Sequence, residues 1–555
     1  MKPVHTSLFG ATAWVVMAVM LGVSGSVLAG PGGGSEHEAA DFVKTADDGF
    51  GDPQNNYAFS SAQLRGDVFV GTGRNFLFRI FEGLIAAGIL PPDYEYQYIT
   101  HSDEPSWSEA RAEDMSAEIW RQRNRGGVWE KVYRSRPADV SAVGYPGAPP
   151  EAWAAREPGF RSMTSFIDKW GDEAIYAASA ASLVPGRLLI KSSDGESWED
   201  VVTFPTIPEG DSRSIAVHNG KLYVGPAGTG TARLWATDDP SSTGDSSNWK
   251  LMADFTNQGS GTNVAVVSLV SWRGFLYAGT QNDDAGFQLW RSDAQSPEDP
   301  SVSGWTQIID SGAGDMASTR ALTMTVFDDA LIVGTSMFPL SVQPPFLLPL
   351  KGFEVIRVAE DDSWELMVGD YFAQRPVGGV PTLRVPRSGW PGGFANFLNL
   401  YCWSLHSYRG VLYLGSFDTT SFLAVVFGTN ATVDPPLVPD VSAQQAALLQ
   451  SVDWLDALPD EELPPAYREL RAAVDVPDPS QIDWAAVWQL ILGRFAGADL
   501  WRTTDLVHWE PVTLNGFDDP TNYGFRTMLR HRAFYVGTAN PFEGLEIHEA
   551  FPGHR

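Results

Sequence analysis

Four arginines are the residues of this sequence that are best suited to bind a ligand. Arg161, Arg213, Arg320 and Arg526 each lie near the start of a predicted β-strand. Guanidinium groups that converge suit a carboxylate, sulfate or phosphate, because they donate paired hydrogen bonds to such anions. The alternative is that each arginine pairs with a nearby Asp or Glu and braces the fold. Arg213 and Arg320 lie at different distances from the next glycine than the other two do, so the sequence does not predict one shared register.

Two further pairs of residues join this candidate ligand site. Arg74 and Asn75 follow a predicted strand that ends on the same face of the fold. Tyr94 and Tyr96 alternate along the chain, with Tyr98 next in the same pattern, so on a strand the three rings would share one side and could stack on a sugar. The same alternation is typical of an ordinary core stripe, which is the interpretation that we favour for the tyrosines.

Metal and catalytic residues are not identified by any motif. Oxygen-bearing side chains near other strand ends would suit Ca²⁺, but the same residue types are ordinary turn formers. We therefore predict no cofactor, but calcium is the metal that these side chains would suit. The oxygen-bearing residues at the strand ends are Asn282, Asp283, Asp284, Asp418 and Asn540. A carboxylate pair or a tyrosine–carboxylate pair for glycan chemistry would draw on Glu95, Asp370, Tyr371 and Asp418. The separations of these groups are not set by the sequence.

The elements that must position these residues are repeats. An apolar-aromatic strand that ends in a small residue, usually Gly, is followed by a strand with Trp-Arg or a similar pair, a polar turn, and a further strand that opens with Trp. The shortest spacings are about 50 residues, the size of a four-stranded propeller blade. Seven copies of the small-residue strand occur, at 68–71, 175–178, 222–225, 276–279, 331–334, 412–415 and 534–537.

The seventh copy stops before its fourth strand, and the missing strand has a match at the other end of the chain. Residues 512–525 and 43–59 share a strand end, Gly-Phe, an Asp-Pro turn and Asn-Tyr. Residues 41–45 are therefore expected to supply the outer strand of the last blade, which would close the ring and remove its free sheet edge. The predicted fold is all-β: a seven-bladed β-propeller closed by the N-terminal strand, with six or eight blades as the alternatives.

The polar turns resemble a known repeat. Residues 192–198 read Ser-Ser-Asp-Gly-Glu-Ser-Trp, and residues 503–509 carry a weaker copy. They resemble the Asp-box turns of sialidase-like propellers, in a chain whose repeats are also similar to kelch-type repeats. The resemblance implies a structural role, in which the Asp satisfies turn amides and the Trp packs between blades. The sialidase Arg-Ile-Pro signature is absent and sialidases have six blades, so the resemblance indicates the fold and not the activity.

Long insertions are predicted to gather on one face and form a partly helical cap. Residues 76–116, 337–352 and 419–496 interrupt loops between second and third strands, and residues 135–159 and 370–398 connect blades. In an antiparallel blade these two classes of loop share a face, and loops of this length in a compact fold are usually functional. The cap is apolar, so its helices either pack on each other, or form an apolar pocket, or present a surface to a protein partner.

The N-terminus predicts export. Residues 1–29 have the form of a signal peptide, residues 30–40 that of a flexible leader, and residues 41–555 form the propeller. No later apolar run is long enough to span a membrane. The mature protein is expected to be extracellular or periplasmic, with Cys402 as a lone thiol.

Charge narrows the function. The chain carries 68 acidic and 38 basic residues, for a net charge of −30, which argues against a nucleic-acid partner. The preferred hypothesis is a secreted propeller that binds an anionic small molecule or an acidic glycan at the capped mouth of its channel. One alternative is an extracellular glycan-active hydrolase or lyase, so the sequence does not decide whether the protein is an enzyme. The other is a cell-surface module that docks a protein partner on its cap.

Overall fold

The structure is a computed structural model. It describes residues 41–78, 101–124, 126–145, 147–207, 211–228, 230–241, 243, 246–293, 302–337, 351–396, 398–421 and 496–550. The predicted signal peptide, the leader, Tyr94, Tyr96 and Glu95, and most of the three large cap insertions lie outside these residues. No helix in the described ranges is long and apolar enough to cross a membrane.

The described residues form seven consecutive groups of four antiparallel strands, which we call units 1 to 7. Unit 1 comprises β2 (Asn55–Leu64), β3 (Asp67–Arg74), β4 (Glu118–Gln122) and β5 (Trp129–Arg134), and unit 2 comprises β8 (Phe160–Ile167), β9 (Glu173–Ser179), β10 (Leu189–Ser192) and β11 (Glu199–Asp200). Unit 3 comprises β12 (Asp211–His218), β13 (Lys221–Ala227), β14 (Arg233–Thr237) and β15 (Lys250–Asp254). Unit 4 comprises β16 (Ala265–Trp272), β17 (Phe275–Gln281), β18 (Leu289–Ser292) and β19 (Trp305–Ile309). Unit 5 comprises β20 (Arg320–Phe327), β21 (Ala330–Ser336), β22 (Val355–Val358) and β23 (Trp364–Val368). Unit 6 comprises β24 (Asn399–Tyr408), β25 (Val411–Asp418), β26 (Leu500–Thr503) and β27 (Trp509–Thr513). Unit 7 comprises β28 (Gly524–Arg530), β29 (Phe534–Ala539), β30 (Ile547–Ala550) and β1 (Phe42–Ala46).

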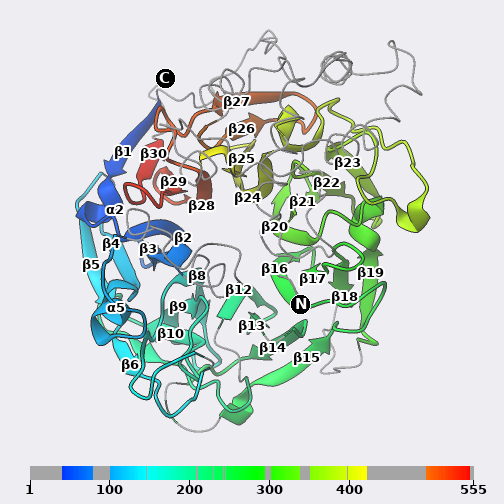
Figure 1. Cartoon of the computed structure of the whole chain (residues 1–555). Helices are drawn as coiled ribbons and strands as arrows, with labels where there is room; N and C mark the ends of the chain where they lie inside the picture. The colour runs from blue at the N-terminus through cyan, green and yellow to red at the C-terminus, as the bar shows by residue number, and fades with distance from the viewer. Residues whose placement is uncertain are drawn as a thin grey trace, which may run out of the picture.

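The arrangement is propeller-like. The first strand of each unit contacts the first strand of the next, from β2 through β8, β12, β16, β20 and β24 to β28, and β28 contacts β2. Figure 1 shows the units following one another around a common centre, with the first strands innermost. The first strands therefore bring together residues that are far apart in the sequence.

Unit 7 takes its fourth strand from the N-terminal end of the described chain. β1 pairs antiparallel with β30, with Phe42 opposite Ala550 and Lys44 opposite His548. The Nζ atom of Lys44 lies 2.6 Å from Oε1 of Glu546. The blue β1 accordingly lies beside the red β30 in Figure 1.

The glycine that ends each repeated phrase has a packing reason. A Cβ atom on Gly71 would lie 2.7 Å from the Cβ of Phe160, and one on Gly415 would lie 2.5 Å from the Cβ of Phe525. In each case the contact comes from the first strand of the following unit, so only glycine lets the two units approach this closely. The core between the units is built from buried aliphatic and aromatic side chains.

The two sequence segments that resemble each other form the same turn. Gly49 and Phe50, in α2 (Asp48–Gly51), and Gly516 and Phe517 all have positive φ angles between 61° and 67°. The Nδ2 atom of Asn55 donates to the Gly49 carbonyl, and that of Asn522 donates to the Gly516 carbonyl. The shared Gly-Phe and Asn therefore encode one local geometry.

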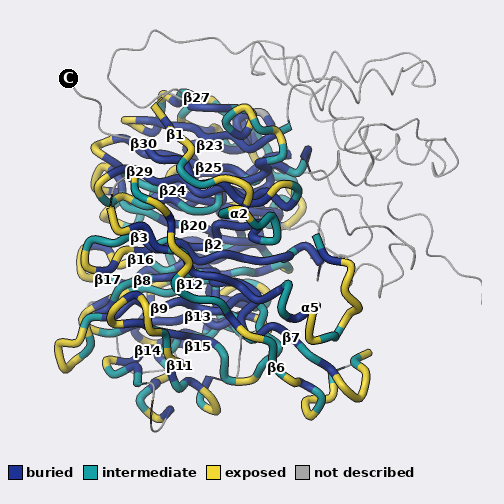
Figure 2. The backbone as a smooth tube through the Cα atoms, turned by 90° about the vertical axis from the view of Figure 1, so that its left-hand side faces the viewer, coloured by how far each residue is buried: buried dark blue, intermediate teal, exposed yellow. Residues whose placement is uncertain are grey.

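The polar turns between third and fourth strands are also alike. Oδ1 of Asp194 accepts hydrogen bonds from the backbone of Glu196 and Ser197, and Oδ1 of Asp505 accepts from the backbone of Val507 and His508. On the described part of the predicted cap, α5 (Glu109–Asp114) packs against β6 (Pro137–Asp139) and β7 (Trp153–Ala155). Figure 2 shows these three elements together at one side of the sheets.

Candidate anion-binding site

A β-bulge occurs at the same place in the first strand of every unit. The pairing with the second strand skips one residue just before a Ser or Thr that lies opposite the repeated Gly, or opposite Ala178 in unit 2. Bulges re-aim side chains and are common next to functional sites. The skipped residues, which we call the bulge ring, are Phe59, Arg161, Arg213, Val267, Leu322, Trp403 and Arg526.

In units 1, 3, 4 and 6 the hydroxyl group after the bulge donates to a backbone carbonyl of the next unit. Oγ of Ser60 donates to the Phe160 carbonyl at 2.6 Å, and Oγ of Ser404 donates to the Phe525 carbonyl at 2.7 Å. Both carbonyls belong to the residue directly before the bulge of the following unit. Each bond therefore ties the first strand of one unit to the first strand of the next.

Three of the four predicted arginines share this register. Arg161, Arg213 and Arg526 are all bulged residues, so Arg213 shares the register of the other two although its distance from the next glycine differs. The distance along the sequence misled because the turns between first and second strands differ in length. Arg320 does lie two residues earlier, at the start of β20, where it pairs with Gln281 of unit 4.

The bulge-ring side chains approach one another across units. The Cζ atom of Arg161 lies 5.6 Å from the ring centroid of Phe59, and the Cζ atom of Arg526 lies 5.6 Å from the same ring. Arg526 also lies 5.5 Å from the ring centroid of Trp403. The Phe59 ring is therefore a common contact of two guanidinium groups from units 2 and 7.

The positive charges of the cluster are only partly neutralised. Nη1 of Arg161 bonds both carboxylate oxygens of Asp211, at 3.0 and 2.8 Å. By contrast, Arg213 and Arg526 have no hydrogen-bonded or ion-paired partner within the described ranges, and both side chains are half-buried. Enclosure by the fold and the charge of Arg161 lower the pKa of Arg526 to about 9. Enclosure and the charges of Arg161 and Arg320 place the pKa of Arg213 well below its usual value.

Arg320 lies beside the bulge ring, next to the hydroxyl group of Tyr401. It hydrogen-bonds Tyr401, and its charge acts on both Tyr401 and Arg213. The hydroxyl groups of Tyr57 and Tyr523 share a hydrogen bond in the same aromatic cluster. Burial raises the pKa of the Tyr401 hydroxyl. These hydroxyl groups are therefore neutral donors at physiological pH.

The bulge ring has two unlike halves. Going around the units, Arg526, Phe59, Arg161 and Arg213 follow one another on one side. Val267, Leu322 and Trp403 complete the ring and are all buried apolar residues. The ring is thus cationic over one arc and apolar over the other. Phe59 and Trp403 were not predicted, although the Ser or Thr after each bulge is a sequence signal that aligns all seven positions.

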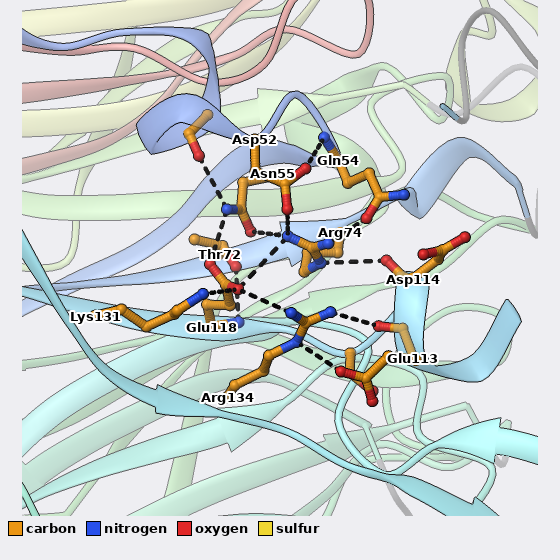
Figure 3. A network of polar contacts seen from close by, with 12 residues as sticks. Asp52, Gln54, Asn55, Thr72, Arg74, Glu113, Asp114, Glu118, Lys131 and Arg134 are labelled. Atoms are coloured by element: carbon orange, nitrogen blue, oxygen red, sulfur yellow. Dashed lines mark hydrogen bonds and ion pairs between the residues drawn. The ribbon is translucent and has the colours of Figure 1, made fainter. Parts of the chain in front are cut away.

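Arg74 and Asn75 lie in a different polar network. Arg74 is fully buried and donates to Asp52, Gln54, Asn55 and the Asp114 carbonyl, as Figure 3 shows. Asn75 is also buried, and its Nδ2 donates to the same carbonyl of Asp114. The structure therefore does not join these two residues to the arginines of the bulge ring, because their donors are used within unit 1 and the cap.

The remaining predicted groups are dispersed. Asp370 lies beside Lys351, which also pairs with Asp315 at 2.6 Å. Asp418 lies in unit 6 near Asp499, whose charge acts on it. Asn282 and Asn540 bond within units 4 and 7. Within the described parts of the chain, no three His, Cys, Asp or Glu side chains form a group that could hold a metal ion.

Comparisons with known proteins do not assign the chain to a family. A scan against protein-family models finds no matching family, and a search of curated proteins finds no matching relative. Among solved structures, the chain is similar to Saccharomyces cerevisiae Sqt1, with a TM-score of 0.36, 8% identity and coverage of 90% of this chain and 97% of that one. It is similar to the extracellular domain of the putative hybrid two component system BT3049 from B. thetaiotaomicron, with a TM-score of 0.37, 9% identity and coverage of 90% of this chain but only 40% of that one.

A third similar structure is the Trypanosoma rangeli sialidase in complex with sialic acid. Its TM-score is 0.30 at 10% identity, and the match covers 65% of this chain and 52% of the sialidase. At such scores none of the three likenesses bears on the ligand or activity of this chain.

Proposed function

We propose that the chain is a seven-bladed β-propeller, closed by β1 as the outer strand of unit 7, that binds an anionic ligand at the bulge ring. The observation that carries the proposal is the pair of half-buried guanidinium groups, Arg213 and Arg526, without a hydrogen-bonded or ion-paired partner in the described structure. Like charges held together in a partly desolvated place repel one another, and a bound anion relieves that repulsion.

The two halves of the ring indicate the class of anion. A simple inorganic anion would use the arginines alone. A sugar acid has a carboxylate that suits the arginines and an apolar ring face that suits Trp403 or Phe59. An acidic glycan is therefore the ligand that we propose. The protein would meet such a glycan outside the cytoplasm, because the predicted signal peptide directs its export. The Asp-box-like turns would brace the blades and take no part in binding.

The test is a titration of acidic and neutral sugars into two proteins. An oligomer of galacturonic acid is titrated into the wild type and into an Arg161→Ala, Arg526→Ala double variant, and the matched neutral galactose oligomer is the ligand control. A hydrogen bond to a charged group contributes about 1.5–3 kcal/mol. Removing two such groups is expected to weaken binding by roughly 100-fold or more.

A matched protein control separates a local effect from a general change of charge. Arg123 and Arg387 are exposed and pair with surface carboxylates, so Arg123→Ala, Arg387→Ala removes the same charge far from the ring. We expect this control to bind the acidic oligomer as the wild type does. Equal binding by the wild type and the ring double variant, or equal binding of the acidic and neutral oligomers, would refute the site.

A further inference from the structure

A buried polar corner recurs where the second strand of a unit leads to the third. In unit 1 the hydroxyl of Thr72 accepts the backbone N–H of Glu118, and the Glu118 carboxylate accepts from Nδ2 of Asn55 (Figure 3). Units 4 to 7 repeat this pattern around one acidic or amide residue each. These corner residues are Glu118, Gln288, Glu354, Asp499 and Glu546, and their side-chain donors are Asn55, Asn263, Ser318, Asn399 and Asn522.

Three of the four acidic corners have a cation of their own. Glu118 lies 2.9 Å from Nζ of Lys131 and 3.7 Å from Nη1 of Arg74. Glu354 lies 2.6 Å from Nζ of Lys351. Glu546 lies 2.6 Å from Nζ of Lys44. A buried carboxylate needs such a partner, because an isolated charge in the interior is costly.

Unit 6 has a second acid in place of the cation. Arg74, Asn282 and Asn540 each lie three residues after the repeated glycine of the second strand, and Asp418 holds that position in unit 6. Asp418 and Asp499 are both buried, and within the described chain neither pairs with a Lys or Arg. The charged group that acts most strongly on Asp418 is Asp499.

The amide of Asn399 points to the same missing partner. In units 1, 4 and 7 the Oδ1 atom of the corresponding Asn accepts from Arg74, Asn282 or Asn540, at 3.1, 3.3 and 3.4 Å. Asn399 is fully buried and its Nδ2 donates to Asp499, but among the residues that the structure describes its Oδ1 has no hydrogen-bond partner. An ionised Asp418 carries no proton that it could donate to this oxygen.

We propose that unit 6 binds a hard divalent cation, Ca²⁺ in the first instance, between the carboxylates of Asp418 and Asp499 and Oδ1 of Asn399. The cation would take the place that the guanidinium of Arg74 takes in unit 1. Carboxylate and amide oxygens are the ligands that Ca²⁺ prefers, and water commonly completes its coordination. The proposal is independent of the bulge ring, because it uses none of the arginines.

The experiment measures cation binding directly. The protein is purified with a chelator, exchanged into chelator-free buffer at pH 8, and titrated with CaCl₂ by calorimetry and by equilibrium dialysis. We expect one Ca²⁺ per chain and a rise in Tm of roughly 2 °C or more at saturation. Asp418→Asn is expected to fold, because Asn holds this position in units 4 and 7, and to lose the bound Ca²⁺ and the Tm response.

The matched control is Asp284→Asn, which removes the same charge from an exposed residue of unit 4. It should bind Ca²⁺ as the wild type does. Absence of Ca²⁺ binding by the wild type would mean that the two carboxyl groups share a proton instead, and it would overturn the proposal. Unchanged binding by Asp418→Asn would also overturn it. If Asp418→Asn fails to fold, Asp499→Asn and the dialysis stoichiometry of the wild type decide the question in the same way.

Discussion

The guanidinium of Arg161 in unit 2 and the carboxylate of Asp211 in unit 3 form an ion pair with both oxygens engaged. This pair neutralises one of the three arginines of the bulge ring. Replacing Asp211 by Asn would leave Arg161 unpaired beside Arg213 and Arg526. We expect Asp211→Asn to bind an acidic oligosaccharide more tightly, by about tenfold, which corresponds to 1.4 kcal/mol. Its melting temperature without ligand should fall.

The control for this prediction is Asp200→Asn, which removes a half-exposed carboxylate that pairs with Arg156 and Arg187. Its affinity for the acidic oligomer should match that of the wild type. Weaker binding by Asp211→Asn would show that Asp211 orients Arg161 for the ligand and does not merely offset its charge.

The pairing of β1 with β30 predicts a large loss of stability when the N-terminal strand is removed. A chain without residues 30–46 loses β1, the buried ring of Phe42 and the ion pair between Lys44 and Glu546. Removing a buried Phe side chain alone costs about 3–5 kcal/mol. We expect the free energy of unfolding in urea to fall by at least that amount, whereas removal of residues 30–40 alone should change little. An unchanged urea midpoint for the longer deletion would contradict the role of β1.

The carboxyl pair in unit 6 predicts an unusual dependence of stability on pH. In the unfolded chain Asp418 and Asp499 release their protons near pH 4, whereas in the folded chain they do so at about 8 and about 7. The folded state therefore binds more protons between pH 4 and 8, and the free energy of unfolding attributable to the pair should fall as the pH rises through this window. Urea denaturation in the presence of a chelator measures the slope. Asp418→Asn should flatten it, and an identical slope in this variant would count against the assignment.

The repeated left-handed turn predicts a graded effect of adding one methyl group. Gly516 has a φ of +67°, and its Cβ would meet the Asp519 carbonyl oxygen and lie 2.9 Å from the Cβ of Asn522. Gly410 has a φ of +79°, but no atom of the described residues would lie within 4 Å of its Cβ. Gly410→Ala is expected to cost about 1–2 kcal/mol from backbone strain alone. Gly516→Ala should cost about 1–3 kcal/mol more because of the added crowding. Equal losses in urea denaturation would show that the crowding is relieved by a shift of the turn.

Much of the architecture is readable in the chain because it rests on local patterns. The repeated strand ending in Gly predicts the second strands, since a larger residue at Gly71 or Gly415 would collide with the neighbouring unit. The Gly-Phe and Asn shared by residues 43–59 and 512–525 encode one turn geometry, so they predicted that the N-terminal strand joins the last repeat. These features depend on residues a few positions apart, and the same short phrase recurs often enough to be recognised.

The candidate anion-binding site could not be predicted from the short repeated sequence motifs alone, because those motifs do not show which side chains of different units face one another. The sequence named Arg161, Arg213 and Arg526 by itself, but their common register came from a bulge in each first strand, which the varying turn lengths conceal. Arg74 was predicted to join the same ligand site, but its guanidinium donates hydrogen bonds to Asp52, Gln54 and Asn55 instead. The pairing of Asp418 with Asp499 was equally hidden, because a long insertion separates them. The sequence alone determined which strands exist and how they repeat, because strand formation is local. Which charges face one another was decided only by the tertiary structure, because it depends on how separate units pack around the centre.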